Sequence, residues 1–283
     1  MHRILLSLAL FTSCAAPMGE RALRPDARSL ASAESAPLAY QEPKAPAPSG
    51  ADASGADKSG TNPAVFLRTL AVGNEYDALR GSSYADLTTI KYIHPFADNR
   101  MNLRTKLPFA VSDAAGGTDS GLGDISVRWN WIADVTLTDA WLVGFDLMLD
   151  TASEDVLGRG KNIGAPVVTR AWFLNATTIF APTLQENVGF GGDSARADVN
   201  ETLIDLYFVK TAADKKSWLT VDPTVVLDWE NDAVPVTLEV EYGWNLGGAF
   251  GGALNAFVRP GIGIGSDRPF DWNLEAGVNV IGF

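Results

Sequence analysis

Met101-Asn-Leu-Arg-Thr-Lys-Leu-Pro-Phe109 is the stretch of this sequence that decides the fold. Its odd-numbered positions hold mostly apolar side chains, and its even-numbered positions hold mostly polar or charged ones. The stretch 124–131 alternates in the same way, with Ile125, Val127, Trp129 and Trp131 set between Asp124, Ser126, Arg128 and Asn130. Successive side chains of a strand point to opposite faces. Both stretches are therefore predicted to be β-strands with one apolar and one polar face.

Two folds explain such strands. A soluble β-sandwich hides the apolar face in a core, whereas a membrane β-barrel turns the apolar face to lipid and the polar face to a lumen. The whole chain has 283 residues, 46% of them hydrophobic, and a formal net charge of −12. This charge argues against nucleic acid as a partner, because nucleic-acid binding needs clustered Lys and Arg. Downstream of the leader, no apolar run reaches the length of about 18 residues that a membrane helix needs.

The first residues are typical of an export signal. His2 and Arg3 form a basic start, residues 4–11 form an apolar core, and the only cysteine of the chain, Cys14, follows two small residues. The segment 1–14 resembles the signal of bacterial lipoproteins, which implies lipidation of Cys14; the alternative is an ordinary secretory signal cleaved near Ala16. Residues 15–62 are dense in Ala, Pro, Ser and Gly, and we expect a disordered linker there.

Residues 63–283 are expected to form one domain, an all-β, antiparallel, up-and-down transmembrane barrel. Turn-forming residues separate about twelve candidate strands, an even number, as single-chain bacterial barrels have. The candidate ranges are 64–72, 84–94, 99–109, 122–132, 141–150, 164–174, 177–186, 199–210, 217–229, 234–245, 249–259 and 271–283.

Aromatic residues favour the barrel over the sandwich. Most of the eight tryptophans lie near predicted strand ends, where barrels place aromatic girdles. The last predicted strand ends on Phe283, which resembles the terminal signal by which the barrel-insertion machinery recognises outer-membrane proteins. The apolar positions of this strand change parity near Gly282, which indicates a bulge there.

Longer motifs resemble a family of outer-membrane transporters associated with the meta-pathway of phenol degradation, and bacterial proteins mislabelled neuromedin U. The matching blocks are Ser120 to Trp129 with its Gly-Leu-Gly-Asp core, Leu147 to Pro166, Asp198 to Thr202, Trp218 to Pro223, Asp228 to Glu230, Val258 to Pro260, and Asp271-Trp272. The resemblance implies a barrel in the bacterial outer membrane, in contact with its lipid, that passes a small hydrophobic or aromatic solute. It supplies no catalytic residue.

If the apolar faces point outward, charged side chains line a lumen. The expected lumenal residues are Arg104, Lys106, Asp124, Arg128, Asp146 and Arg170. Opposed charges there either pair into a closed plug or leave a polar conduit. Because acidic residues outnumber basic ones among all candidates, we expect a conduit to prefer cations or neutral solutes.

An enzyme is not expected. His94 is the only histidine beyond the leader, and nothing in the sequence places it near Ser126, the one lumenal serine considered as a nucleophile. No metal-ligand spacing and no complete phosphate-binding loop is present, so no cofactor is expected. We therefore expect a passive channel or transporter. The alternatives are a closed-lumen structural or anchoring lipoprotein and a periplasmic β-sandwich lipoprotein that binds a ligand.

Overall fold

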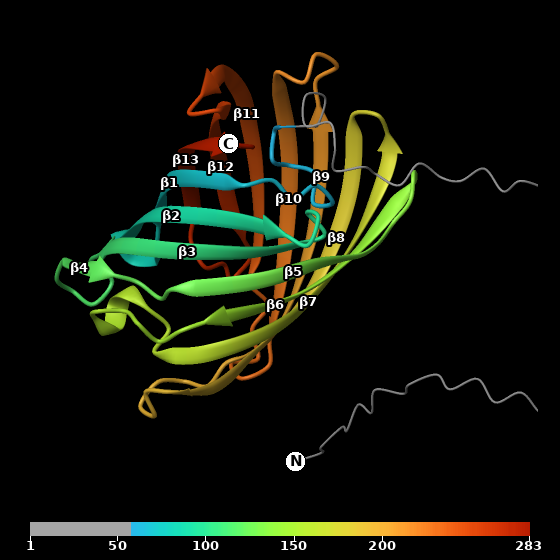
Figure 1. Cartoon of the computed structure of the whole chain (residues 1–283). Helices are drawn as coiled ribbons and strands as arrows, with labels where there is room; N and C mark the ends of the chain where they lie inside the picture. The colour runs from blue at the N-terminus through green and yellow to red at the C-terminus, as the bar shows by residue number, and fades with distance from the viewer. Residues whose placement is uncertain (1–57) are drawn as a thin grey trace, which may run out of the picture. The chain divides into compact units, whose positions relative to one another are not determined.

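A computed structural model describes residues 58–283 as thirteen strands and two short 3₁₀ turns, Arg80–Ser82 and Asp155–Leu157 (Figure 1). The strands are β1 (Thr69–Ala78), β2 (Tyr84–Phe96), β3 (Met101–Ser112), β4 (Asp119–Leu122), β5 (Ser126–Val135), β6 (Asp139–Met148), β7 (Lys161–Asn175), β8 (Thr178–Gly192), β9 (Asn200–Thr211), β10 (Ser217–Asp228), β11 (Val236–Ala249), β12 (Gly252–Ile264) and β13 (Trp272–Ile281). Each of the twelve predicted ranges overlaps an observed strand. Cys14, the signal segment and most of the predicted linker lie outside the described residues.

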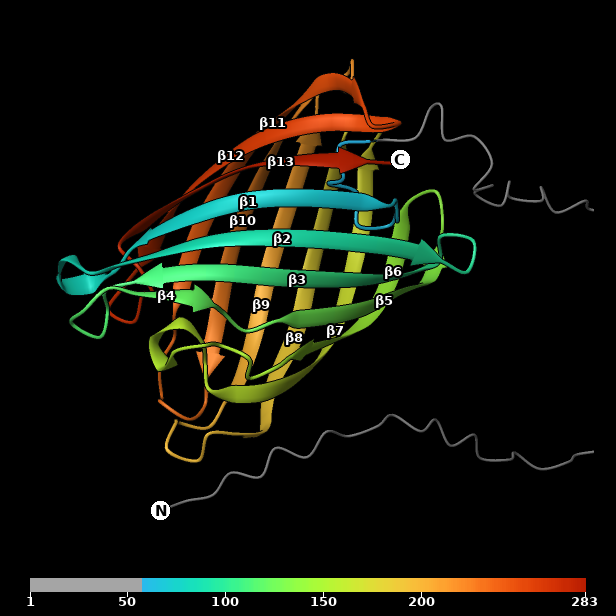
Figure 2. The same ribbon diagram turned by 60° about the vertical axis from the view of Figure 1, so that its left-hand side comes forward.

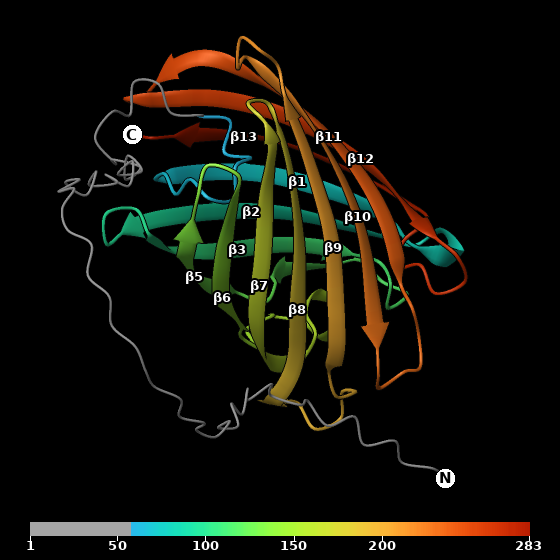
Figure 3. The same cartoon turned by 90° about the vertical axis from the view of Figure 1, so that its right-hand side faces the viewer.

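The sheet closes on itself into a barrel. Strands pair antiparallel in chain order, and β1 pairs with β2 on one side and with β13 on the other. The β1–β13 seam runs without a shift from Thr69 opposite Ile281 to Ala78 opposite Trp272. Figures 2 and 3 show the strands wrapping around this closed wall from two further directions. The barrel prediction is confirmed and the sandwich alternative is wrong.

Thirteen strands fill only twelve positions in the wall. β4 pairs with residues 109–112 of β3, and β5 pairs with residues 101–106 of the same strand. The chain breaks the ladder between β4 and β5, where the Gly123 amide donates to the Pro108 carbonyl at 3.0 Å. β4 is therefore an interrupted continuation of the β5 position rather than a separate strand of the barrel.

The outer face of the wall is apolar. Leu103 is 41% exposed and Phe145 is 46% exposed, whereas Asn102, the neighbour of Leu103 in the chain, is 5% exposed. Similar exposed apolar side chains recur along the wall: Leu70, Val72, Phe109, Leu184, Leu206, Leu219, Val258, Ile262, Leu274 and Val278. A soluble protein rarely shows an apolar surface of this extent, so the alternation of the sequence has its apolar side outward.

The two ends of the barrel differ in their connections. Turns of two to five residues join β2 to β3, β5 to β6, β7 to β8, β9 to β10 and β11 to β12, and we call this the short-turn end. β1 begins and β13 ends there as well. The opposite, long-loop end carries connections of five to thirteen residues.

Aromatic side chains lie near both ends of the outer face, as expected from the sequence. Strand positions place Trp131, Trp141, Trp172 and Trp244 near the short-turn end, and Tyr76, Tyr84, Trp229 and Trp272 near the long-loop end. Trp218 is an exception: it is 2% exposed, and its indole N–H donates to Glu241 Oε1 at 2.6 Å. Trp218 belongs to the interior.

Residues 58–68, which we call the plug, pack inside the barrel before β1 begins. Tyr207 of β9 donates its hydroxyl to the Thr61 carbonyl at 3.2 Å, and Asn255 of β12 donates to the Lys58 carbonyl at 2.9 Å. The Phe66 ring packs in an apolar cluster on the inner wall, formed by Ile132, Ala140, Leu142, Ala171, Ile179, Ala181 and Val209.

The plug corrects the predicted start of the first strand. A strand from residue 64 is wrong, because residues 62–65 form a turn in which Asn62 accepts from the Ala64 amide through its side chain and from the Val65 amide through its carbonyl. Pro63, which lacks an N–H donor, lies within this turn. The last five residues of the predicted linker, 58–62, also lie in the plug. Within residues 58–283, no helix has the length and apolar character needed to cross a membrane.

Candidate functional site

The interior of the barrel holds a cavity of about 600 Å³. Residues from every strand position except that of β7 line it, and the plug residues 59–61 line one part of it. Two groups of charged residues lie at this space. We call Lys91, Arg104, Lys106 and Arg128 the basic wall, and Glu75, Glu239, Glu241 and Glu275 the acidic wall. Glu239 does not line the cavity itself, and joins the acidic wall through Asn273 and Arg259.

Neighbouring strands assemble the basic wall by register. Lys91 of β2 lies opposite Lys106 of β3, and Arg104 of β3 lies opposite Arg128 of β5. Two of these four cations pair with one carboxylate, that of Asp146. Arg128 Nε donates to Asp146 Oδ2 at 2.7 Å, and Arg104 Nη2 lies 3.7 Å from the same oxygen. Arg128 also donates to Gln185 Oε1 at 2.5 Å.

Lys91 and Lys106 have no hydrogen-bond or ion-pair partner among residues 58–283. Both ammonium groups therefore belong to a wall in which cations outnumber carboxylates four to one. Like charges this close repel one another unless water or an anion screens them. The basic wall consequently presents uncompensated positive charge to the cavity.

The acidic wall, in contrast, is paired internally. Arg259 of β12 donates to Glu241 Oε2 at 2.7 Å, lies 3.2 Å from Glu275 Oε2 and lies 3.7 Å from Glu239 Oε2. Asn273 of β13 donates to Glu75 at 2.8 Å and to Glu239 at 2.5 Å. Every carboxylate of this wall thus accepts a hydrogen bond or an ion pair from a neighbouring strand.

The two walls adjoin each other around the lumen, because β1 of the acidic wall pairs with β2 of the basic wall. The basic wall lies on β2, β3 and β5, and the acidic wall lies on β1, β13 and β11. A solute in the cavity therefore meets positive charge on one side and paired carboxylates on the other.

Five of the six residues predicted to line the lumen lie at this cavity: Arg104, Lys106, Asp124, Arg128 and Asp146. Asp124 also has a clear structural role. Its carboxylate accepts the backbone amides of Thr151 at 3.1 Å, Ala152 at 3.1 Å and Arg159 at 2.6 Å. It thereby ties the loop 149–160 to the wall at the break between β4 and β5.

The sixth residue, Arg170, does not lie in the lumen. It lies opposite Trp141 in the register of β6 and β7, on the outer face, and pairs with Asp139 at 2.9 Å. Its guanidinium carbon is 4.9 Å from the ring centres of both Trp141 and Trp172. The lumenal prediction is wrong because inward positions on β7 are odd-numbered, as buried Ile163, Ala165 and Ala171 show.

Several charged lumenal residues escaped the sequence interpretation. Glu75 and Asp77 fall beyond the predicted first strand, although Leu70, Val72 and Tyr76 carry its outward alternation. Lys91 was not recognised as lumenal, because Ile90, Tyr92 and Ile93 around it are all apolar and obscure the alternation of the strand. Glu275 could have been predicted as lumenal from the alternation of its strand. Leu274 and Ala276 on either side share the outward parity of Trp272 and Val278, which turns Glu275 inward.

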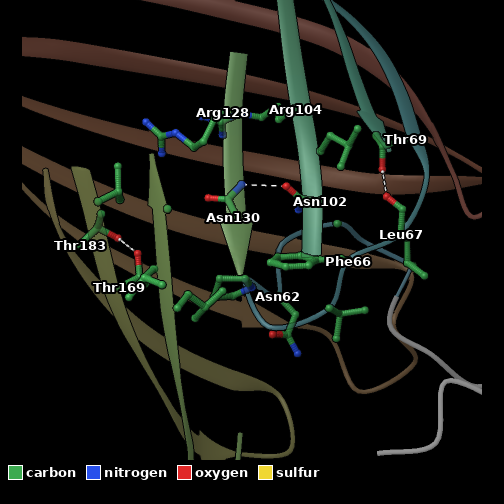
Figure 4. Close-up of a pocket in the computed structure, with 18 of the residues that line it drawn as sticks. Asn62, Phe66, Leu67, Thr69, Asn102, Arg104, Arg128, Asn130, Thr169 and Thr183 are labelled. Atoms are coloured by element: carbon green, nitrogen blue, oxygen red, sulfur yellow. Dashed lines mark hydrogen bonds between the residues drawn. The ribbon is translucent and has the colours of Figure 1, made fainter. Parts of the chain in front are cut away.

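A second cavity of about 240 Å³ lies between the plug and the wall toward the short-turn end. Figure 4 shows Asn62, Phe66 and Leu67 of the plug on one side, and Asn102, Asn130, Thr169 and Thr183 on the other. Asn130 donates to Asn102 at 2.8 Å, and the hydroxyls of Thr169 and Thr183 are 2.7 Å apart. Arg104 and Arg128 border both cavities.

The residues considered for catalysis lie apart. His94 shares the exposed face of β2 with Tyr92, and their ring centres are 6.3 Å apart, whereas Ser126 is buried on the cavity side of β5. Within the described residues, no group of His, Cys, Asp and Glu side chains has an arrangement that could hold a metal ion. The geometry of this site is suited to binding or conducting a charged solute.

A closed antiparallel barrel with an apolar exterior and a charged interior is the architecture of transmembrane β-barrels. The chain matches no protein-family model and no curated protein. It is similar to the crystal structure of an outer-membrane channel from Pseudomonas putida F1, with a TM-score of 0.62, 12% identity, and coverage of 77% of this chain and 96% of that one. It is also similar to the NanC porin, with a TM-score of 0.52, 10% identity, and coverage of 76% and 99%. At these identities, the likeness is one of fold.

Proposed function

We propose that this chain is a β-barrel of the bacterial outer membrane that lets a small solute pass through its lumen without an energy source. The observation that carries this proposal is the cavity of about 600 Å³ lined by charged side chains within a closed wall whose outer face is apolar. Two proteins of similar fold are described as an outer-membrane channel and a porin, which supports the same function here.

The proposal fixes an orientation. Outer-membrane barrels have short turns on the periplasmic side and longer loops outside the cell. The short-turn end, with the plug and both ends of the described chain, would therefore face the periplasm. The tryptophans near the two ends of the outer face would lie at the two membrane interfaces, where the polar edge of the ring meets water.

Several expectations from the sequence belong to this proposal. Cys14 would carry the lipid of a lipoprotein, and the strand ending near Phe283 would be recognised by the barrel-insertion machinery. Membership of the phenol meta-pathway type of transporter family, with a hydrophobic or aromatic solute, is also part of it. Replacing Cys14 with Ser tests the anchor, since acyl labelling of the protein should be lost; labelling that persists would contradict lipidation.

A closed-lumen barrel that only anchors or scaffolds is the second candidate. The plug favours it, because residues 58–68 lie inside the barrel and Phe66 packs on the inner wall near the short-turn end, which narrows the lumen there. The charged walls are compatible with both functions, so they do not separate them. The two functions differ in whether ions cross the barrel.

Planar-bilayer recording of the purified full-length protein separates the two. Heat-modifiable migration on a gel first shows that the barrel is folded. We expect stepwise currents above background from the folded protein. No current at several hundred millivolts from a protein with normal heat-modifiable migration would favour the closed barrel. A protein that stays soluble and monomeric without detergent would contradict both.

A further inference from the structure

We propose that the basic wall is a binding site for the anionic group of a small organic solute. This inference rests on the proposed passage of a solute through the lumen, and it names the class of that solute. The site consists of Lys91, Arg104 and Lys106, with Arg128 behind them.

The basic wall holds more cations than its nearby carboxylate can pair with. Asp146 is already shared by Arg128, at 2.6 Å, and Arg104, at 3.7 Å. Lys106 lies opposite Lys91 in the register of β2 and β3, and it lines the cavity together with Arg104, Arg128 and Asp146. A bound carboxylate would relieve the repulsion among these cations and accept charge-assisted hydrogen bonds from both lysines.

The carboxylates of the acidic wall already have partners. Glu239, Glu241 and Glu275 surround Arg259, and Asn273 bridges Glu75 and Glu239. These carboxylates are occupied, so they are poor ligands for an entering cation. Among the charged residues that line this cavity, Lys91 and Lys106 are the ones without a hydrogen-bond or ion-pair partner, so the charge available to a solute here is positive, although the chain as a whole carries a formal net charge of −12. This inference therefore differs from the sequence-based expectation of a preference for cations or neutral solutes.

The cavity has the size and the lining of a small-molecule site. A volume of about 600 Å³ falls within the range of roughly 300 to 1,000 Å³ typical of small-molecule sites. Leu87, Met148 and Tyr207 also line the cavity, and as half-buried side chains they offer apolar surface. The cavity thus suits an anion with an organic body.

Binding of citrate to the full-length protein in detergent tests the proposal without requiring conduction. We expect citrate to bind the wild-type protein, and uncharged glucose to bind at least tenfold more weakly. Lys91→Gln and Lys106→Gln should each weaken citrate binding about fivefold, the effect of one unit charge at about 4 Å in a water-like medium. Lys106→Arg, which keeps the charge, should retain binding.

Lys210→Gln is the matched control. Lys210 is exposed near the end of β9, away from the cavity, and the substitution removes the same charge. Its citrate affinity should equal that of the wild type. Raising the salt concentration should weaken citrate binding to the wild-type protein, which tests the charge dependence without any variant. Citrate that does not bind, or that binds the wild type and both Lys→Gln variants equally, would overturn the proposal.

Ion selectivity distinguishes the failure of this inference from the failure of the proposed function. In a KCl gradient, the wild-type pore should show a reversal potential on the anion side, and Lys91→Gln combined with Lys106→Gln should shift it toward cations. A current without anion preference rejects the inference and leaves the channel standing. Citrate binding without current rejects the channel and leaves the anion site standing.

Discussion

Arg170 lies on the outer face of the barrel with its guanidinium carbon 4.9 Å from the ring centres of both Trp141 and Trp172. Asp139 neutralises it at 2.9 Å. Guanidinium groups stack favourably on indole rings, and an ion pair makes a charge less unfavourable near lipid. This group is therefore a membrane-interface element rather than part of a conduit.

Arg170→Ala should lower the free energy of unfolding by about 1 kcal/mol, the sum expected for partly exposed ring contacts and an ion pair. It should leave the conductance unchanged, because the side chain lies outside the lumen. Urea unfolding in lipid vesicles, followed by heat-modifiable migration, measures the first quantity. Lys210→Ala, which removes an exposed cation that does not stack on an aromatic ring, is the control and should unfold like the wild type. An altered conductance with unchanged stability would contradict this assignment.

At the scale of elements, the plug is the part of the chain that most constrains the lumen. Its Phe66 side chain packs on the inner wall near the short-turn end, and its backbone carbonyls accept hydrogen bonds from Tyr207, Asn255 and the Gly282 amide. Phe66 is the buried apolar side chain of the plug, 8% exposed and packed in the apolar cluster of the inner wall, so truncating that ring should release the plug.

Phe66→Ala should raise the single-channel conductance and make residues 58–68 accessible to protease. A buried Phe→Ala change costs about 3–5 kcal/mol in a packed core, enough to dislodge a short segment. Bilayer recording and limited proteolysis read by mass spectrometry test the two effects. Leu70→Ala removes a similar apolar side chain from the exposed outer face of β1 and should change neither. Unaltered conductance and protection in Phe66→Ala would show that the plug is held by other contacts.

Two loops at the long-loop end are joined by Asp267. The Val234 amide donates to its carboxylate at 3.0 Å, and Ser266 donates at 3.0 Å. These hydrogen bonds, that from Val234 first, hold the pKa of Asp267 below its ordinary value of 3.8. A lowered folded-state pKa means that the stabilising contact is fully present above pH 3.8 and is lost as the pH falls through the lower folded value.

In an NMR titration in detergent micelles, the Val234 amide signal should therefore shift with a midpoint below pH 3.8. Asp267→Asn should abolish that titration, since the amide side chain does not ionise in this range. Asp232→Asn in the loop that contains Val234 is the matched control and should leave the titration in place. A midpoint at or above pH 3.8 in the wild type would contradict the role given to the Val234 hydrogen bond.

Strand positions could be predicted from the sequence because each strand carries its own alternation and ends at turn residues. The interior could not, since its partners are far apart in the chain: Asn273 and Glu75 are separated by 198 residues. The plug escaped prediction because Val65, Phe66 and Leu67 are as apolar as a strand. Arg170 was misplaced because Trp172 beside it reads equally well as a core or a surface residue.

At the scale of the described barrel, closure depends on the ten-residue seam between β1 and β13. β13 pairs on both sides, with Val278 opposite Val72 of β1 and Ala256 of β12. Any loss of hydrogen bonding in β13 therefore weakens the wall where its first and last strands meet.

Val278→Pro should prevent closure, since proline removes a ladder hydrogen bond and is not tolerated in a strand paired on both sides. We expect the variant to migrate identically on gels with and without heating. Val278→Thr keeps the amide and a β-branched side chain, and should remain heat-modifiable. A folded, heat-modifiable proline variant would show that the seam tolerates a gap.

The contact between Gly60 and Ile281 couples the plug to the closure of the barrel. Gly60 has a φ of +79°, and a side chain placed there would come within 2.6 Å of the Ile281 Cδ1 methyl at the end of β13. The first part of the described chain thus rests on the last residue of β13, so this contact exists only when the final strand is in place. A barrel that has lost β13 is therefore expected to hold residues 58–68 less firmly.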